Sequence, residues 1–173
     1  ETVVIRLDEN KLELVKGTTR QLNATIIPAD ENAAFEWFSS NPEYVSVSET
    51  GLVKAEKLYY KNPTDTEVTP VTIYCKYNGG AAECKVTVTP KAVKSIGIEG
   101  INTDANQYII LNPGEERTLK VTFEPEDADV DFSRLEWKTD DFEYVSIAPE
   151  SDTDSAVITA RLAGSARITA TYS

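Results

Sequence analysis

The chain has 173 residues and contains no histidine, no methionine and only two cysteines. Without histidine it lacks the residue that most often serves as a general base and as a metal ligand. It also has no apolar run long enough to cross a bilayer and no signal-peptide pattern. Because it starts with Glu and lacks Met, we expect a mature or excised segment. These absences argue against membrane insertion of this segment and give catalysis little support.

Positive charge is scarce as well, because 29 acidic residues outnumber 17 basic ones and give a net charge of −12. A surface this acidic repels the phosphate backbone of nucleic acids and anionic lipid headgroups. We therefore expect neither nucleic acid nor a membrane surface among the partners. The acidic excess by itself serves solubility.

The sequence contains the same pattern twice. Residues 12–28 resemble residues 109–125, and four residues of that stretch recur at a constant offset: Gly17, Leu22, Thr25 and Pro28 return as Gly114, Leu119, Thr122 and Pro125. Residues 35–37 return as residues 135–137, and residues 43–47 as residues 143–147. Self-similarity over such a length indicates two copies of one domain and not a single larger fold.

Both copies are dominated by short runs in which apolar and polar residues alternate. These runs are residues 22–26, 35–37, 45–47, 73–77 and 84–88 in the first copy and residues 119–123, 135–137, 145–147 and 168–170 in the second. Alternation of this kind predicts strands with one buried face. Short strands spaced about eight to twelve residues apart, with one tryptophan per copy, predict an all-β fold of two β-sandwiches. We expect Trp37 and Trp137 to lie in the two cores.

The boundary between the copies is predicted near Pro90, which gives domains of residues 1–90 and 91–173. The connector, residues 89–92, is short, has no Gly or Ser, and has one φ fixed by the proline ring, so we expect limited bending. The first copy ends with the run of residues 84–88, whereas the second stops at Ser173 before any counterpart. We expect the second domain to lack its last strand, to be the less stable, and to expose a C-terminal edge open to strand addition or self-association.

Three motifs of the first copy follow one another in order: LxLxxGxTxxLxATxxP at residues 12–28, WxSSNPxxV at residues 37–45 and GLVxA at residues 51–55. They resemble the bacterial immunoglobulin-like domain, group two, and the resemblance covers nearly all of both copies. It implies two tandem immunoglobulin-like β-sandwiches of an extracellular or cell-surface bacterial protein, in adhesins, invasins or surface enzymes. Fold alone does not fix function. The first copy departs from the family pattern at residues 58–67, a longer polar insertion.

Cys75 and Cys84 flank a turn sequence. If Gly79-Gly80 forms a two-residue hairpin loop, the two cysteines face each other as a non-hydrogen-bonded pair, where side chains approach most closely. Both lie on the apolar face, so we predict a disulfide, which would indicate an oxidising compartment. The alternative is a pair of buried thiols that pack as small apolar groups. Two thiolates without histidine do not complete a zinc site.

Asp127, Asp129 and Asp131 alternate in the manner of carboxylates in a calcium-binding loop. The helix–loop–helix form of such a site is excluded, because Phe132 stands where that loop needs Gly and Lys138 where it needs a bidentate Glu. A calcium loop of another kind stays open as an alternative to a solvated acidic turn between strands. We expect no metal and no other cofactor.

Tyr59 and Tyr60 form an aromatic pair inside the polar insertion. Loop rings that can also hydrogen-bond suit the recognition of a glycan or a protein. Packing over the edge of the sandwich is the alternative. Tyr59 and Tyr60 are therefore candidate ligand-binding residues.

The residues give no catalytic arrangement. Ser39, Ser40 and Ser46 have no histidine partner, and adjacent carboxylates lack the cleft geometry of glycoside hydrolysis. With the resemblance, the duplication and the short connector, we expect a bacterial surface segment that acts in cell adhesion or as a spacer presenting a distal domain. Its partner would be a protein or glycan on a surface. The alternative, suggested by the tyrosine pair, is a carbohydrate-binding accessory module of a polysaccharide-processing system.

Overall fold

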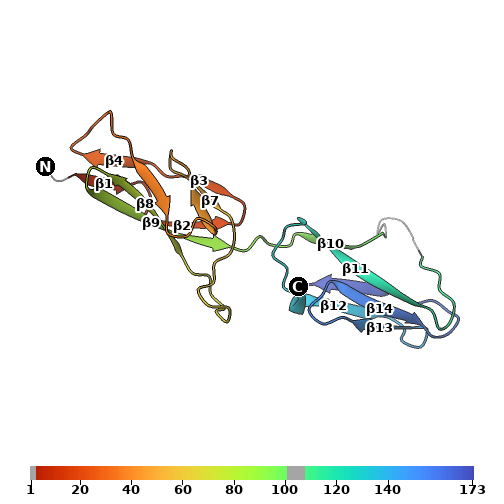
Figure 1. Cartoon of the computed structure of the whole chain (residues 1–173). Coiled ribbons are helices and arrows are strands. Elements are labelled where there is room, and N and C mark those ends of the chain that lie inside the picture. The colour runs from red at the N-terminus through yellow and green to blue at the C-terminus, as the bar shows by residue number, and fades with distance from the viewer. Residues whose placement is uncertain (1–2, 101–107) are drawn as a thin grey trace. The chain divides into compact units, whose positions relative to one another are not determined.

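The structure is a computed structural model that describes residues 3–100 and 108–173. The chain divides into two compact units, Glu1–Lys91 (unit one) and Ala92–Ser173 (unit two), each built from strands (Figure 1). One short 3₁₀ turn, η1 (Phe132–Arg134), lies in unit two, and the described residues form no α-helix. No helix in these ranges could span a membrane. The predicted all-β fold of two sandwiches is confirmed.

Unit one consists of two sheets that face each other across a core, and a two-stranded pair. Its strands are β1 (Val4–Leu7), β2 (Lys11–Val15), β3 (Thr19–Gln21), β4 (Ala24–Ile27), β5 (Glu36–Ser39), β6 (Val45–Val47), β7 (Leu52–Ala55), β8 (Val71–Tyr77) and β9 (Gly80–Thr89). One sheet has the order β2-β9-β8-β5, in which β2 and β9 are parallel. The other has the order β3-β7-β6, and β1 pairs with β4.

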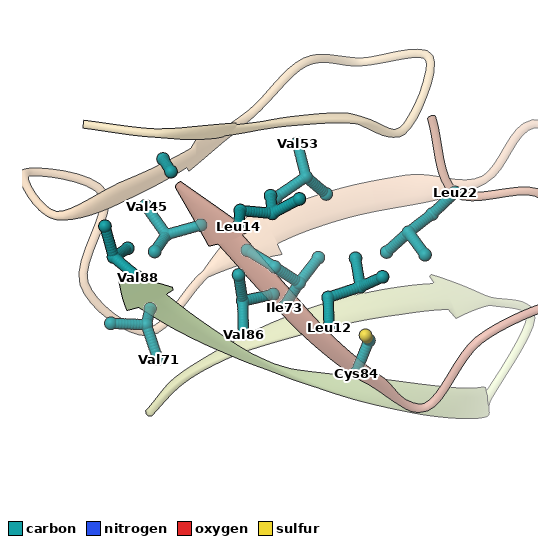
Figure 2. Packing of buried hydrophobic residues seen from close by; sticks show 11 residues of the cluster. Leu12, Leu14, Leu22, Val45, Val53, Val71, Ile73, Cys84, Val86 and Val88 are labelled. Carbon is teal, nitrogen blue, oxygen red and sulfur yellow. The ribbon is translucent and has the colours of Figure 1, made fainter. Parts of the chain in front are cut away.

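The core of unit one takes alternate residues from strands of both sheets, as the sequence pattern predicts. The buried side chains include Leu12, Leu14, Leu22, Val45, Val53, Val71, Ile73, Cys84, Val86 and Val88 (Figure 2). Burial of each Val, Leu or Ile side chain contributes about 1.5–3 kcal/mol to folding. The long strand β9 supplies three of the least exposed members, so it is a main wall of this core.

Trp37 of β5 joins this core to a second cluster around Ile5 and Ile26. Its indole ring packs on Gly51, which precedes β7. A Cβ atom at Gly51 would lie 2.8 Å from the ring and 2.7 Å from the carbonyl oxygen of Leu22, and the residue has a φ of +86°. Glycine alone meets both conditions without strain. The structure thus packs Trp37 against the core, as expected, although its ring is only partly buried.

The hairpin between β8 and β9 differs from the predicted one. Its turn is Asn78-Gly79, and the register pairs Cys75 with Ala82 and Ile73 with Cys84. Both turn residues have a positive φ, 43° and 81°, a conformation that Asn-Gly favours in a type I′ turn. The two cysteines are therefore not opposite each other, and both are buried free thiols. The predicted disulfide is wrong, and the inference of an oxidising compartment loses its support.

Unit two repeats the plan with fewer strands. They are β10 (Ser95–Ile98), β11 (Glu116–Glu124), β12 (Leu135–Thr139), β13 (Val145–Pro149), β14 (Ser155–Ala160) and β15 (Ile168–Tyr172). The sheets are β10-β11-β14-β13 and β12-β15. Strand β11 is continuous where unit one divides the same stretch into β3 and β4. Among the described residues of unit two, none forms a counterpart of β2 or of β9.

The core of unit two is centred on Trp137, whose side chain packs with Leu119, Val121 and Ile158. Trp137 is 8% exposed. Its indole N–H is buried and has no hydrogen-bond acceptor within the described part of the chain. Ile168 of β15 is only half-buried, whereas Ile73, its match in β8, is fully buried. The core of unit two is thus more open beside β15 than the core of unit one is beside β8.

Candidate binding surface

The insertion of unit one is a loop fastened at its base. The N–H of Thr69 donates to the carbonyl oxygen of Tyr59 at 2.6 Å, and the N–H of Lys61 donates to the hydroxyl of Thr69 at 3.2 Å. The Tyr59 ring lies against the Tyr44 ring, with centroids 4.7 Å apart, and packs on the core. Tyr60 is 40% exposed. The structure therefore separates the two candidates: Tyr59 anchors the loop, and Tyr60 is accessible to a ligand.

A second aromatic feature lies on the outer face of the β5–β8 pair. Phe38 and Tyr74 are directly opposite each other in the register, and their rings stack with centroids 4.9 Å apart and planes 19° from parallel. The Lys76 ammonium lies 4.7 Å from the centre of the Phe38 ring. Phe38 is 38% exposed. We call Phe38, Tyr74 and Lys76 the outer-face aromatic cluster.

The outer-face aromatic cluster was not predicted from the sequence, although a signal was present. Phe38 follows the core residue Trp37, and Tyr74 precedes the core residue Cys75, so each is an aromatic residue at an outward position of an alternating strand. In unit two the matching positions hold Lys138 and Thr169, which are paired in the register of β12 and β15. The aromatic pair is therefore not a requirement of the shared fold.

A tyrosine at the end of one strand is tied to an aspartate loop in each unit. In unit one the Tyr77 hydroxyl donates to the Asp30 carboxylate at 2.7 Å, which lowers the pKa of Asp30 and raises the pKa of Tyr77. In unit two the hydroxyl of Tyr172 accepts a hydrogen bond from the N–H of Asp131 at 3.0 Å. In each unit this hydrogen bond fastens the loop that precedes the strand carrying the tryptophan, β5 in unit one and β12 in unit two.

In the acidic stretch of unit two, residues 127–131, Asp131 caps the 3₁₀ turn η1. The Asp131 carboxylate accepts hydrogen bonds from the hydroxyl and the N–H of Ser133, at 2.6 and 3.1 Å, and these bonds lower its pKa. Asp131 thereby caps η1. Within residues 3–100 and 108–173, no three acidic or thiol side chains are grouped closely enough to hold a metal ion. Asp127 and Asp129 have interactions of their own, and the three candidates do not form one site.

The two thiols belong to the interior of unit one. Burial raises the pKa of Cys75 to about 11, and burial with the nearby charges of Glu9 and Asp8 raises the pKa of Cys84 to about 11. Because the thiolate is the reactive form of cysteine, buried thiols with a raised pKa are inert at neutral pH. The cysteines therefore act as core residues, which is the alternative to the disulfide that the sequence left open.

Comparison with known proteins relates unit one to a family. Residues 2–58 match the family model of the bacterial Ig-like domain, group 2. This match confirms the resemblance that the motifs of the first copy indicated. The stretch runs from the first strand to the residues just after β7, so it ends where the insertion begins.

Two curated relatives share part of the sequence. A lacto-N-biosidase of Bifidobacterium bifidum is 38% identical over 78 residues, which cover 45% of this chain and 6% of that protein. A minor capsid protein of Enterobacteria phage T3 is 36% identical over 84 residues, 49% of this chain and 17% of that protein. The chain thus spans less than a fifth of either relative. Among solved structures, the S-layer protein rSbsC aligns with 99% of this chain and 26% of its own, at 15% identity and a TM-score of 0.40.

Proposed function

We propose that the chain is a non-catalytic module of a bacterial surface-displayed or secreted protein, in which the two units act as a spacer that presents a distal domain. The observation that carries the proposal is the family match of unit one together with the repetition of its strand plan in unit two. Serial copies of a folded sandwich add length to a protein without adding new chemistry. The proline at position 90, with its fixed φ, limits the freedom of the connector.

The test of the spacer role replaces the segment inside the full-length protein. One variant carries a Gly/Ser linker of the same number of residues, which is a flexible coil whose end-to-end distance fluctuates widely and holds no fixed spacing. A second variant carries an unrelated pair of sandwich domains of the same size. Antibody access to an epitope tag on the distal domain is measured on intact cells at equal expression. We expect the linker to reduce access and the unrelated pair to restore it.

An adhesive role of the segment itself gives a different outcome in the same experiment. If the surface of these two units binds a partner, the unrelated pair restores tag access but not cell attachment. Loss of attachment with normal tag access would therefore replace the spacer by an adhesion function. Full access with the flexible linker would contradict the spacer proposal.

A second candidate function is carbohydrate binding as an accessory module. It is supported by the partial identity with a protein that is named as a glycan-cleaving enzyme and by the exposed aromatic side chains of Tyr60 and Phe38. Glycan-array binding of the 173-residue chain tests it, with Tyr60→Ala and Phe38→Ala as separate variants. Tyr59→Ala is a poor test, because this change removes the ring that packs against Tyr44. Binding that survives both single variants would remove these two surfaces from consideration.

A further inference from the structure

Strand β5 forms one edge of the larger sheet of unit one, and part of its backbone is unpaired. The N–H of Ser40 donates to the carbonyl oxygen of Thr72 at 2.8 Å. Because backbone groups of an antiparallel strand bond to one neighbour at alternate residues, those of Trp37 and Ser39 point away from β8. Within the described part of unit one, β8 is the only strand that pairs with β5, and these backbone groups of Trp37 and Ser39 have no hydrogen-bond partner.

A cleft lies beside this edge. It has a volume of about 640 Å³ and is lined by residues 33–37, which lead into and begin β5, and by Glu49 and Thr50 of the turn between β6 and β7. The Trp37 ring is half-buried, whereas Trp137 of unit two is only 8% exposed. A ligand in the cleft can therefore contact the Trp37 ring and the backbone of β5 at the same time.

The two ionisable residues that line the cleft, Glu36 and Glu49, are both acidic and exposed. Within residues 3–100, neither carboxylate forms an ion pair or a side-chain hydrogen bond. Lys76 is opposite Glu36 in the register, but its ammonium lies over the Phe38 ring. The cleft thus combines uncompensated negative charge with an aromatic ring, which suits the side chain of a lysine or arginine.

Unit two has the matching strand, β12, but different residues around it. Pro149 stands at the position of Glu49. Glu136, the match of Glu36, forms an ion pair with Lys138 at 2.8 Å. The unpaired carboxylates and the accessible tryptophan are therefore features of unit one and not requirements of the shared fold.

We propose that the edge of β5 and the adjoining cleft form a docking site for an extended, basic segment of another protein. The segment would add to the sheet antiparallel to β5, and its residue opposite Trp37 would exchange main-chain hydrogen bonds with Trp37. Residues opposite each other direct their side chains to the same face. A lysine or arginine at this position would therefore enter the cleft and place its cation near Glu49.

This arrangement accounts for both parts of the site. Main-chain hydrogen bonds give strand addition its affinity, and the pockets for alternate side chains give its specificity. The edge of β5 supplies the first, and the acidic cleft supplies the second. The inference goes beyond the proposed spacer function, because it assigns a partner of defined chemistry to unit one.

The edge of β5 suits a separate polypeptide better than the alternatives. Unit one contains its last strand, because β9 follows β8 and joins it to β2, so β5 does not border the place of a missing strand. If two copies of this chain paired through their β5 strands, the Glu36 carboxylates of both would lie at one interface and repel each other. A glycan has no regular row of N–H donors and C=O acceptors to match the strand. The net charge of −12 also favours a basic partner.

The first experiment titrates the isotope-labelled 173-residue chain with the blocked peptide acetyl-TTVRKTT-amide and follows binding by NMR. In the antiparallel register the arginine of the peptide lies opposite Trp37, its lysine opposite Glu36 and its valine opposite Phe38. We expect saturable binding of one peptide per chain, with shifts at residues 33–40 and 48–51 and at the Trp37 indole. The Trp137 indole in the same spectrum is an internal control and should not shift.

Two changed peptides separate the main-chain contribution from the charge. N-methylation of the arginine removes the N–H that would donate to the Trp37 carbonyl oxygen, and it should weaken binding at least about tenfold. A peptide with glutamate in place of the arginine should show no saturable binding, because its carboxylate would face Glu49.

Charge reversal in the chain makes the test specific. Glu49→Lys should abolish binding of the arginine peptide and confer binding of the glutamate peptide. Glu83→Lys is the matched control, because Glu83 is exposed on β9 and does not line the cleft. It changes the net charge by the same amount and should weaken binding by less than about twofold, since exposed charges far apart are screened by salt. Both changes are on exposed side chains, so we expect both variants to fold.

Three results would overturn the proposal. The first is equal affinity for the N-methylated and the unmodified peptide, which would exclude strand addition. The second is an equal loss of binding in Glu49→Lys and Glu83→Lys, which would mean general attraction to an acidic chain. The third is hydrogen-exchange protection of residues 36–39 in the full-length protein without peptide, where the 173-residue chain shows none, because another part of the same protein would then cover the edge. None of these results bears on tag access in the spacer experiment.

Discussion

The two units share a sequence pattern, but their cores differ in how completely the strands cover them. In unit one the core-facing residues of β8, Val71, Ile73 and Cys75, are at most 1% exposed. In unit two Ile168 and Ala170 of β15, which match Ile73 and Cys75, are half-buried. The difference follows from one strand, because β9 covers β8 and joins it to β2. Closure of this sandwich therefore depends on its last strand more than on the number of strands already paired.

The comparison also separates what the fold needs from what one copy adds. Both units keep a tryptophan packed on the core, a glycine with positive φ before the matched strands β3 and β11, and the tyrosine tie to an aspartate loop. Only unit one has the insertion with Tyr60 and the stacked Phe38–Tyr74 pair. Features that both units share are explained by folding, so the features found only in unit one are the better candidates for recognition.

The largest expected effect comes from removing the tryptophan of each unit. Trp137→Ala should cost about 3–5 kcal/mol by loss of a large buried ring. Trp37→Ala should cost less, because its ring is only partly buried, and each change should act mainly on its own unit. Because the core of unit two is more open, we expect Trp137→Ala to unfold unit two and Trp37→Ala to leave unit one folded with a lower melting temperature. Hydrogen exchange followed by mass spectrometry measures both units in one sample.

Outward-facing neighbours on the same strands are the controls for the tryptophan variants. Phe38→Ala on β5 and Lys138→Ala on β12 alter the solvent side of each sheet and should have much smaller effects. Equal protection of the two units after both tryptophan changes would show that unit two is not the weaker one.

Strand positions and cores were predictable from the sequence because alternation reports directly which face is buried. The hairpin register was not predicted correctly, because Asn78, Gly79 and Gly80 offer two overlapping turns and the prediction used the second. The conformational preference of Asn-Gly for a type I′ turn decides the matter, and it moves Cys84 opposite Ile73. Tyr59 and Tyr60 are adjacent in sequence, but Tyr59 packs on Tyr44 and Tyr60 is exposed. Only the tertiary contact with Tyr44 distinguishes them.

A glycine comparison tests the packing of the tryptophan in unit one. Gly17 and Gly114 are matched residues with φ of +85° and +92°, and a methyl group added at either would lie in open space. Alanine at either position should therefore cost only the left-handed strain of about 1–2 kcal/mol. Gly51 has a similar φ, but its Cβ would meet both the Trp37 ring and the carbonyl oxygen of Leu22, so Gly51→Ala should cost about 1–3 kcal/mol more than Gly17→Ala. Urea unfolding measures the difference, and equal costs would mean that both contacts relax freely.

Alkaline pH should weaken unit one through its two thiols. A thiol that ionises near pH 9 in the unfolded chain and only near 11 in the folded one favours folding fully below pH 9, and this contribution is lost as the pH rises to about 11. Unit two has no cysteine. In Trp137→Phe, Trp37 fluorescence reports unit one alone, and its urea midpoint should fall over this range. In the Cys75→Ala/Cys84→Ala variant the urea midpoint should fall less over this range, because the thiols no longer contribute. An unchanged pH dependence would contradict the assignment of the fall to the two thiols.

The smallest expected effect concerns the tyrosine ties, which look alike but differ in chemistry. In unit one the acceptor is the Asp30 carboxylate, whose pKa is lowered from 3.8 by the Tyr77 hydroxyl. Because this pKa is lower in the folded state, the stability from the tie is present above pH 3.8 and is lost as the pH falls through the folded-state pKa. In unit two the Tyr172 hydroxyl accepts from a backbone N–H, which does not titrate.

The small destabilisation by Tyr77→Phe should therefore disappear in acid, while that by Tyr172→Phe should stay constant. Melting temperatures of both variants against the unchanged chain, from pH 7 to pH 3, measure this, and a parallel loss in both would mean that the carboxylate is not the acceptor in unit one.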